Sequence, residues 1–381
     1  MPLAPVIQTL AELVRINSIN AAYEGSPGER EIATWVRRFF EQRGIEVREQ
    51  EVFPGRPNVI ARLPGRNPAR RVVLEAHMDT VSVKGMTIPP FEPRIENGRM
   101  YGRGSCDTKA GLAAMMQAVA SLHAAGITPP CEVWFAATVD EEHSFGGVTK
   151  LCEGLRADAA VVAEPTELRV VVASKGILRW RIVVRGKAAH SATPHLGINA
   201  IEHMARIILA FETDHQRLAR QQVHPMLGPA TCNVGLVSGG AQINFVPATC
   251  SIDIDRRLLP GEKADAVLAH YQGLLDHLKS QHPTLDTVME PPMIVDEALE
   301  TPTDSAVVQL ASTLVKELGR DGRPAGVPYG SDASKLSRQG VPSIIIGPGN
   351  IDQAHGAVEF VDLAQVELAE KFHRNFIERF E

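Results

Sequence analysis

Residues 71–79, RVVLEAHMD, are an apolar run that ends in a histidine and an aspartate. Four further segments place an acidic residue or a histidine after an apolar run or a glycine-rich turn: YGRGSCD (101–107), EVWFAATVDEE (132–142), AAVVAEP (159–165) and SIIIGPGNIDQAH (343–355). Apolar runs bounded by turn residues are typical of buried strands in a parallel sheet, which binds ligands at the carboxyl ends of its strands. The pattern predicts an α/β protein with a site at one edge of its sheet.

Helices and strands are expected to alternate in the first and last parts of the chain. The first part has helix 28–44, strand 71–76, helix 109–125, strand 131–139, helix 146–154 and strand 159–163. The last part has helix 303–318, strand 341–346 and helix 362–380. This alternation predicts a doubly wound, mostly parallel sheet with helices on both faces.

The middle of the chain has a different pattern. Its expected elements are strand 177–185, helix 198–217, strands 230–237 and 247–256, helix 261–280 and strand 285–290. The order β-α-β-β-α-β is that of a ferredoxin-like unit, which forms a domain by itself. We therefore predict one domain of residues 1–175 and 291–381, with a second domain of residues 176–290 inserted into it.

The composition is that of a globular protein, with 44% apolar and 22% charged residues in a chain of 381. A net charge of −6 without a basic cluster argues against a nucleic-acid partner. No apolar run reaches the roughly 18 residues that span a membrane, and no signal peptide is evident. Five scattered cysteines without a C-x-x-C pair favour a reducing compartment, so we expect a cytoplasmic protein.

The acidic residues and histidines at the predicted sheet edge form a candidate metal site. Carboxylates cannot be held together unpaired, because like charges repel and burying each one costs several kcal/mol. Histidines and carboxylates without thiolates suit divalent ions in a catalytic site. Taken singly, His77 with Asp79 could be a structural pair, and Glu141 with Glu142 a solvated one. The whole set favours two bound cations.

The five segments, in this order, resemble the dinuclear zinc aminoacylase and exopeptidase family. This family includes acetylornithine deacetylase, succinyl-diaminopimelate desuccinylase and glutamate carboxypeptidase, and the resemblance covers essentially the whole chain. It implies two divalent ions, zinc in the first place with cobalt or manganese as substitutes. The ligands that it implies are His77 and Glu164 for one ion, Glu142 and His355 for the other, and Asp107 as the bridge. It also implies that Asp79 orients His77 and that Glu141 is the general base.

The same resemblance makes the inserted domain a lid and dimerisation domain. Arg257 in DIDRRLLPGE resembles the arginine that binds the substrate carboxylate, a task that suits the bidentate guanidinium. Arg256 is its competitor, but it would face the other side of the strand. Asn244 matches a substrate contact, and the loop with Ser331 is expected to close over the same end. His190 in GKAAHSATP resembles a histidine that stabilises the oxyanion, and in dimeric relatives it comes from the partner subunit.

The segment GPGNIDQAH (347–355) resembles the acetylornithine deacetylase branch. The expected substrate is therefore N-acetylornithine or a similar N-acetyl amino acid, and the expected role is in arginine biosynthesis. Thr108 and Ala110 depart from that branch, which leaves succinyl-diaminopimelate and dipeptides as alternative substrates. A non-catalytic binding protein would be expected to lack Glu141 or some ligands. A two-metal phosphoesterase would not account for the lid arginine or for the paired glutamates.

Overall fold

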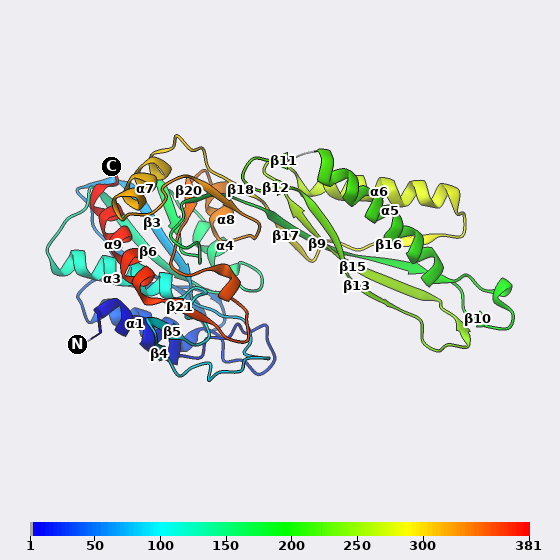
Figure 1. Ribbon diagram of the computed structural model, residues 1–381, viewed down its shortest axis with the longest axis horizontal. Helices are drawn as coiled ribbons and strands as arrows, with labels where there is room; N and C mark the ends of the chain where they lie inside the picture. The colour runs from blue at the N-terminus through cyan, green and yellow to red at the C-terminus, as the bar shows by residue number, and fades with distance from the viewer. Residues whose placement is uncertain (1–2, 222) are drawn as a thin grey trace. The chain divides into compact units, whose positions relative to one another are not determined.

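The computed structural model describes residues 3–221 and 223–381, which form two compact units (Figure 1). Unit 1 contains the chain up to Val172, Thr301–Ala325 and Ser331–Glu381. Unit 2 contains Ala173–Glu300 and Gly326–Gly330.

A mixed sheet organises unit 1. Its strands lie in the order β1 (Glu46–Phe53), β2 (Arg56–Leu63), β6 (Cys131–Thr138), β3 (Asn67–His77), β7 (Ala159–Val162), β20 (Ser343–Ile345) and β8 (Val171–Ser174). The four central strands β6, β3, β7 and β20 are parallel, whereas the β1–β2, β2–β6 and β20–β8 pairs are antiparallel. The residues of β7 and β20 are all buried, as expected of parallel strands covered on both faces. The predicted doubly wound, mostly parallel sheet is confirmed.

Two groups of helices accompany this sheet (Figure 1). The first comprises α1 (Pro5–Arg15), α2 (Arg30–Glu41), α3 (Lys109–Ala124), α7 (Ala306–Glu317) and α9 (Leu363–Arg379), with α3 packed against α1 and α9. The second comprises α4 (Gly146–Cys152) and α8 (Ala333–Arg338), which pack against each other. A Cβ at Gly111 of α3 would lie 2.6 Å from that of Ala163, so only glycine lets α3 approach the segment that leads to Glu164.

Helix α1 and the β1–β2 hairpin were not predicted from the sequence. Helix α1 begins at Pro5 without a capping side chain, so the usual start signal is missing. Strand β1, EVREQEVF, has no buried residue and lies at the edge of the sheet. An exposed edge strand does not show the continuous apolar run of a buried parallel strand.

Unit 2 is built on an antiparallel sheet of strands β13 (Thr231–Gly239), β15 (Thr249–Leu258), β9 (Gly176–Arg185) and β16 (Asp286–Met289), in this order. Helix α5 (Ala200–Gln221) packs against β9, β13 and β15, and α6 (Ala264–Gln281) packs against α5 and β16. Trp180 and Phe211 place their rings 5.0 and 4.8 Å from that of Tyr271 in the core. The chain order of these six elements is the expected β-α-β-β-α-β.

Unit 2 extends further along the chain than the predicted residue 290. Strand β17 (Ile294–Asp296) adds to β9 after a break in pairing at the two prolines 291 and 292. Proline cannot donate to a strand ladder, which accounts for this break. The hydrogen bonds of β17 keep the chain within unit 2 up to Asp296, and the pairing of β18 with β8 accounts for Leu299 and Glu300.

Short elements complete the fold. They are β4 (Arg94–Glu96), β5 (Arg99–Tyr101), β10 (Ala189–His190), η1 (Pro194–Leu196), β11 (Val223–His224), β12 (Gly228–Pro229), β14 (Phe245–Val246), β18 (Leu299–Glu300), β19 (Ala325–Val327), η2 (Ile351–Gln353) and β21 (Phe360–Asp362). Three of them, β21, β5 and β4, form one small sheet, and β10 pairs with β14. No helix in the described ranges is long and apolar enough to cross a membrane.

His373 of α9 is fully buried, and neither ring nitrogen has a hydrogen-bond partner among the described residues. Burial lowers the pKa of its imidazole to about 3, so the folded protein holds it neutral. Because the usual pKa is 6.5, the folded state loses stability as the pH falls from 6.5 towards 3.

We predict that His373→Leu increases the free energy of unfolding at pH 7 by about 1–3 kcal/mol, since an unpaired buried polar group is removed. The variant should also lose less stability than the wild type between pH 6.5 and 4. Urea unfolding of both proteins at several pH values measures the difference. An equally steep loss of stability in His373→Leu would contradict the assignment.

Candidate metal centre

The five expected metal ligands come from five separate segments of unit 1. His77 is the last residue of β3, Glu142 follows β6, and Glu164 follows β7. Asp107 lies in the turn between β5 and α3, and His355 lies in the loop between η2 and β21. The carboxyl ends of the central parallel strands thus supply the first three ligands, as the sequence pattern predicts.

Asp107 stands at the centre of this cluster and directs one carboxylate oxygen to each histidine. Its Oδ1 lies 3.2 Å from His77 Nε2, and its Oδ2 lies 3.3 Å from His355 Nε2. On the first side, Glu164 Oε1 is 4.0 Å from His77 Nε2. On the second side, Glu142 Oε1 is 3.2 Å from His355 Nε2. Two groups of ligands therefore share one carboxylate, which suits a pair of ions bridged by Asp107.

Glu141 also faces this cluster. One of its carboxylate oxygens lies within 4.8 Å of ligand atoms of His77 and Glu164. Its backbone N–H donates to Asp79 Oδ1 at 3.1 Å, and that of Glu142 donates to Asp79 Oδ2 at 3.0 Å. Asp79 therefore positions both glutamates.

Asp79 also meets His77, in the way expected of a residue that orients it. The Nδ1 atom of His77 lies 3.0 Å from the carbonyl oxygen of Asp79 and 3.5 Å from its Oδ1. Asn20, which the sequence analysis missed, donates to Asp79 Oδ2 at 2.7 Å and to Asp140 Oδ1 at 3.1 Å. Asn20 lies in a loop after α1, and nothing in its local sequence marks this long-range contact.

The three glutamates of the cluster resist ionisation, whereas hydrogen bonds with His355 and His77 overcome the effect of burial and lower the pKa of Asp107. Burial raises the pKa of Glu142 to about 7, and the nearby charge of Asp107 adds to this effect. Burial also raises the pKa values of Glu141 and Glu164 well above the usual range. Such groups ionise together only when positive charge is supplied beside them.

The two histidines carry part of that positive charge. Hydrogen bonds with Asp107 and Glu142 raise the pKa of His355 to about 10. Burial opposes protonation of His77, yet hydrogen bonds with Asp107 and Asp79 raise its pKa well above the usual range. A divalent ion would displace the proton from each imidazole, because metal ligands must be deprotonated.

The donor atoms fit divalent metal ions. Two imidazole nitrogens and several carboxylate oxygens converge, and this set suits zinc and related ions in catalytic sites. Cys106, next to Asp107, does not join them, because its thiol donates to the carbonyl oxygen of Asn350 at 3.4 Å. The donor set thus lacks the thiolates that many structural zinc sites use.

Ser331 lies before α8 and is fully buried, and its expected contact with substrate stays a prediction. The neighbouring Asp332 is also buried. Its Oδ2 lies 3.3 Å from the hydroxyl oxygen of Thr138, which donates to Glu75 at 2.5 Å. Asp332 and Glu75 therefore form a buried acidic pair behind the site.

Arg257 and Arg256 point to opposite sides of β15, as the alternation of a strand requires. Arg257 is partly exposed, and its Nε donates to Asp255 Oδ1 at 2.8 Å. The side chain of Arg256 is buried, with Nη2 2.6 Å from Glu262 Oε1. Arg257 is therefore the one of the two that a ligand can reach from solvent.

His190 and Asn244 lie together, at the other end of the unit 2 sheet. Strand β10 pairs with β14, and the N–H of Ser191 donates to the carbonyl oxygen of Asn244 at 3.0 Å. Both residues are exposed. Strand β15 runs from Thr249, near this ribbon, to Arg257, a length of about 26 Å at about 3.3 Å per residue.

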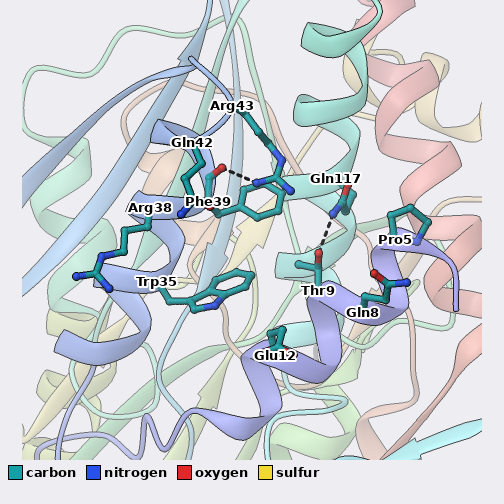
Figure 2. Close-up of a pocket in the computed structure, with 10 residues that line it drawn as sticks. All are labelled: Pro5, Gln8, Thr9, Glu12, Trp35, Arg38, Phe39, Gln42, Arg43 and Gln117. Atoms are coloured by element: carbon teal, nitrogen blue, oxygen red, sulfur yellow. Dashed lines mark hydrogen bonds between the residues drawn. The ribbon is translucent and has the colours of Figure 1, made fainter. Parts of the chain in front are cut away.

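A separate cavity of about 450 Å³ lies among α1, α2 and α3 (Figure 2). Figure 2 shows the indole of Trp35 at its wall and hydrogen bonds from Arg43 to Phe39 and from Gln117 to Thr9. Its lining includes one carboxylate, Glu12, and no histidine or cysteine. This cavity therefore does not share the metal-binding chemistry of the cluster.

The chain resembles known proteins in sequence and in fold. Residues 73–379 match the model of peptidase family M20/M25/M40. The chain is 30% identical to an acetylornithine deacetylase of Photorhabdus laumondii subsp. laumondii, over 99% of this chain and 98% of the relative.

Two solved structures share the fold. A tripeptidase from Staphylococcus aureus superposes with a TM-score of 0.80 at 23% identity, covering 98% of this chain and 97% of that one. A dinuclear metal-binding M20 peptidase from Bacillus subtilis superposes with a TM-score of 0.74 at 17% identity, covering 99% and 98%.

We predict that the metal-free protein loses stability as the pH rises. The pKa of Glu142 is raised from 4.5 to about 7, and that of His355 from 6.5 to about 10. Both groups hold their proton more tightly in the folded state, so this stabilisation is complete below pH 4.5 and is lost progressively up to about pH 10.

Melting temperatures measured with EDTA should therefore fall between pH 5 and 9. The increase in melting temperature on adding zinc should grow over the same range, because bound cations replace the lost protons. If the melting temperature of the metal-free protein stays level or rises across this range, the cluster is not held together by protons.

Proposed function

Because the chain belongs to peptidase family M20/M25/M40, we propose that it hydrolyses the amide bond of an N-acyl amino acid, with N-acetylornithine as the first candidate. The observation that carries this proposal is Asp107, shared between two histidine–carboxylate groups with Glu141 beside it. The relative named acetylornithine deacetylase, matched over nearly its whole length, supports the choice of substrate. The likeness to a tripeptidase keeps a short peptide as the alternative.

The metal ligands proposed here are His77, Asp107, Glu142, Glu164 and His355. Two bound divalent ions, zinc in the first place with cobalt or manganese as substitutes, would polarise the scissile carbonyl and lower the pKa of a water molecule. Glu141 takes a proton from the attacking water and delivers it to the leaving amine. Burial raises the pKa of Glu141, which suits a group that must accept a proton. The carboxylate of Asp79 accepts the backbone N–H of Glu141 and so keeps Glu141 in place.

Arg257 is the proposed contact for the substrate carboxylate. Its Nε pairs with Asp255, whereas its Nη2 lies 3.5 Å from the same side chain, in a weak contact. Asp255 also accepts from Arg179 Nε at 2.6 Å, so it is already neutralised. A substrate carboxylate can therefore bind the outer edge of the Arg257 guanidinium in bidentate fashion.

We also propose a homodimer in which each unit 2 supplies His190 to the partner's site. His190 and Arg257 lie at opposite ends of β15, so one small substrate cannot touch both residues of one chain. Strand β13 is a sheet edge, and its Leu236 and Val237 are about two-thirds exposed. An exposed apolar edge strand favours pairing with the same strand of a second copy.

Glu141→Gln is predicted to keep the bound metal and to lower kcat by about 10²–10⁴-fold, because a positioned base is lost. Hydrolysis of N-acetylornithine, N-succinyl-diaminopimelate and dipeptides should be compared in one assay, with metal content measured for each protein. The proposal expects N-acetylornithine to have the highest kcat/KM. Wild-type activity in Glu141→Gln would assign the base elsewhere, and a preference for dipeptides would favour the peptidase alternative.

The shared site can be tested by mixing subunits. His190→Ala and Glu141→Gln should each be inactive alone, whereas a mixed dimer has one site with an intact Glu141 and the partner's intact His190. Random exchange should then restore about a quarter of wild-type activity, since half of the dimers are mixed and each has one complete site. Native mass spectrometry confirms exchange. No recovery in exchanged samples would place His190 in the site of its own chain or outside catalysis.

A further inference from the structure

One buried carboxylate joins the two loops that carry Asp107 and His355. Glu359 follows His355 by four residues and is 1% exposed. Its Oε1 accepts the backbone N–H of Cys106 at 2.9 Å and that of Asp107 at 3.1 Å. Its Oε2 accepts Nη1 of Arg103 at 2.6 Å. A side chain from the His355 loop thus holds the backbone of the proposed bridging ligand.

Arg103 holds Glu359 from the other side. Arg103 is 2% exposed, and its Nη2 donates to the carbonyl oxygen of Ser82 at 3.1 Å. The backbone N–H of Gly102 also donates to the carbonyl oxygen of Glu359 at 3.1 Å. Immediately after Glu359, strand β21 pairs with β5, which leads into the Asp107 turn. The two loops are therefore aligned by a strand pair and then joined by a side chain.

The shape of the turn explains why an anion is needed. Gly102 and Gly104 have φ values of 148° and 78°, which side chains disfavour. The turn directs the consecutive N–H groups of Cys106 and Asp107 to one point, and such concavities bind anions. A buried ion pair gives little net stability compared with a well-packed apolar pair. Stability alone thus does not account for a charged residue at position 359.

We propose that Glu359 is a positioning residue that sets the spacing between Asp107 and His355. At this spacing Asp107 Oδ2 and Glu142 Oε1 lie 3.3 and 3.2 Å from His355 Nε2, so one divalent ion can take all three as ligands. The inference rests on the proposed metal centre. Asp107 also serves the ion on the His77 side, but Glu359 makes no hydrogen bond to His77 or Glu164 in the described residues. Its effect should therefore be larger for the ion on the His355 side, where Glu359 aligns both the Asp107 turn and the His355 loop.

The experiment is a cobalt(II) titration of the metal-free protein, followed by visible absorption. The wild type should bind two ions per chain. Glu359→Asp keeps the negative charge beside Arg103. Its side chain is one methylene shorter, so the carboxylate lies about 1.5 Å farther from the backbone N–H groups of Cys106 and Asp107. Glu359→Gln keeps the length but turns an amide NH₂ towards Arg103. In both variants the ion on the His355 side should bind about 10–100-fold more weakly with an altered spectrum, and the other ion should weaken less.

Glu262 offers a matched control in unit 2. Its Oε1 pairs with Arg256 Nη2 at 2.6 Å, and its Oε2 accepts the backbone N–H of Leu259 at 2.7 Å. It combines an arginine and a backbone N–H as Glu359 does, but no proposed metal ligand is involved. Glu262→Asp and Glu262→Gln should therefore show the wild-type titration, whatever they do to the melting temperature.

Three results would overturn the inference. If Glu359→Asp binds both ions as the wild type does and only melts at a lower temperature, Glu359 is merely structural. If both ions weaken equally, Glu359 does not act mainly on the His355 side. If the wild type itself binds no second ion, the metal centre fails, and with it this inference. The wild-type titration thus separates failure of the premise from failure of the role given to Glu359.

Discussion

The mutual repulsion of buried carboxylates is the constraint on which this structure depends. Asp107, Glu141, Glu142 and Glu164 converge at one edge of the unit 1 sheet, where burial makes each charge costly. In the metal-free chain, protons on glutamates and histidines relieve this repulsion, and metal ions would relieve it more strongly. The folded chain therefore has one site at which bound cations would be strongly stabilising.

Other buried charges support the cluster without joining it. Asp79 and Glu359 each accept two backbone N–H groups from segments that carry proposed ligands or the proposed base. Asp140, adjacent to Glu141, pairs with Arg56, which also binds Glu29. Carboxylates that accept backbone N–H groups fix the loops to which they bind. Polar contacts thus hold the loops of the site. Because hydrogen bonds are directional, they fix the orientation of these loops, which apolar packing does not.

Unit 2 contributes a different kind of constraint. Its sheet places Arg257 at one end and His190 with Asn244 at the other, and β15 separates them. Both groups have the chemistry of substrate contacts, yet a rigid sheet keeps them apart within one chain. The proposed use of both groups on one small substrate would draw them from two copies, and the exposed edge of β13 offers a surface for that pairing.

The sequence by itself determined the order of strands and helices, the parallel centre of the sheet and the cluster of proposed ligands, because these depend on local apolar patterns and on where strands end. It did not reveal α1, which begins without a capping side chain, or the β1–β2 hairpin, whose first strand has no buried residue. Only the tertiary structure decided the contacts of Asn20 and Glu359, because each partner lies dozens to hundreds of residues away along the chain. The separation of His190 from Arg257 likewise follows from strand pairing, which no local pattern specifies.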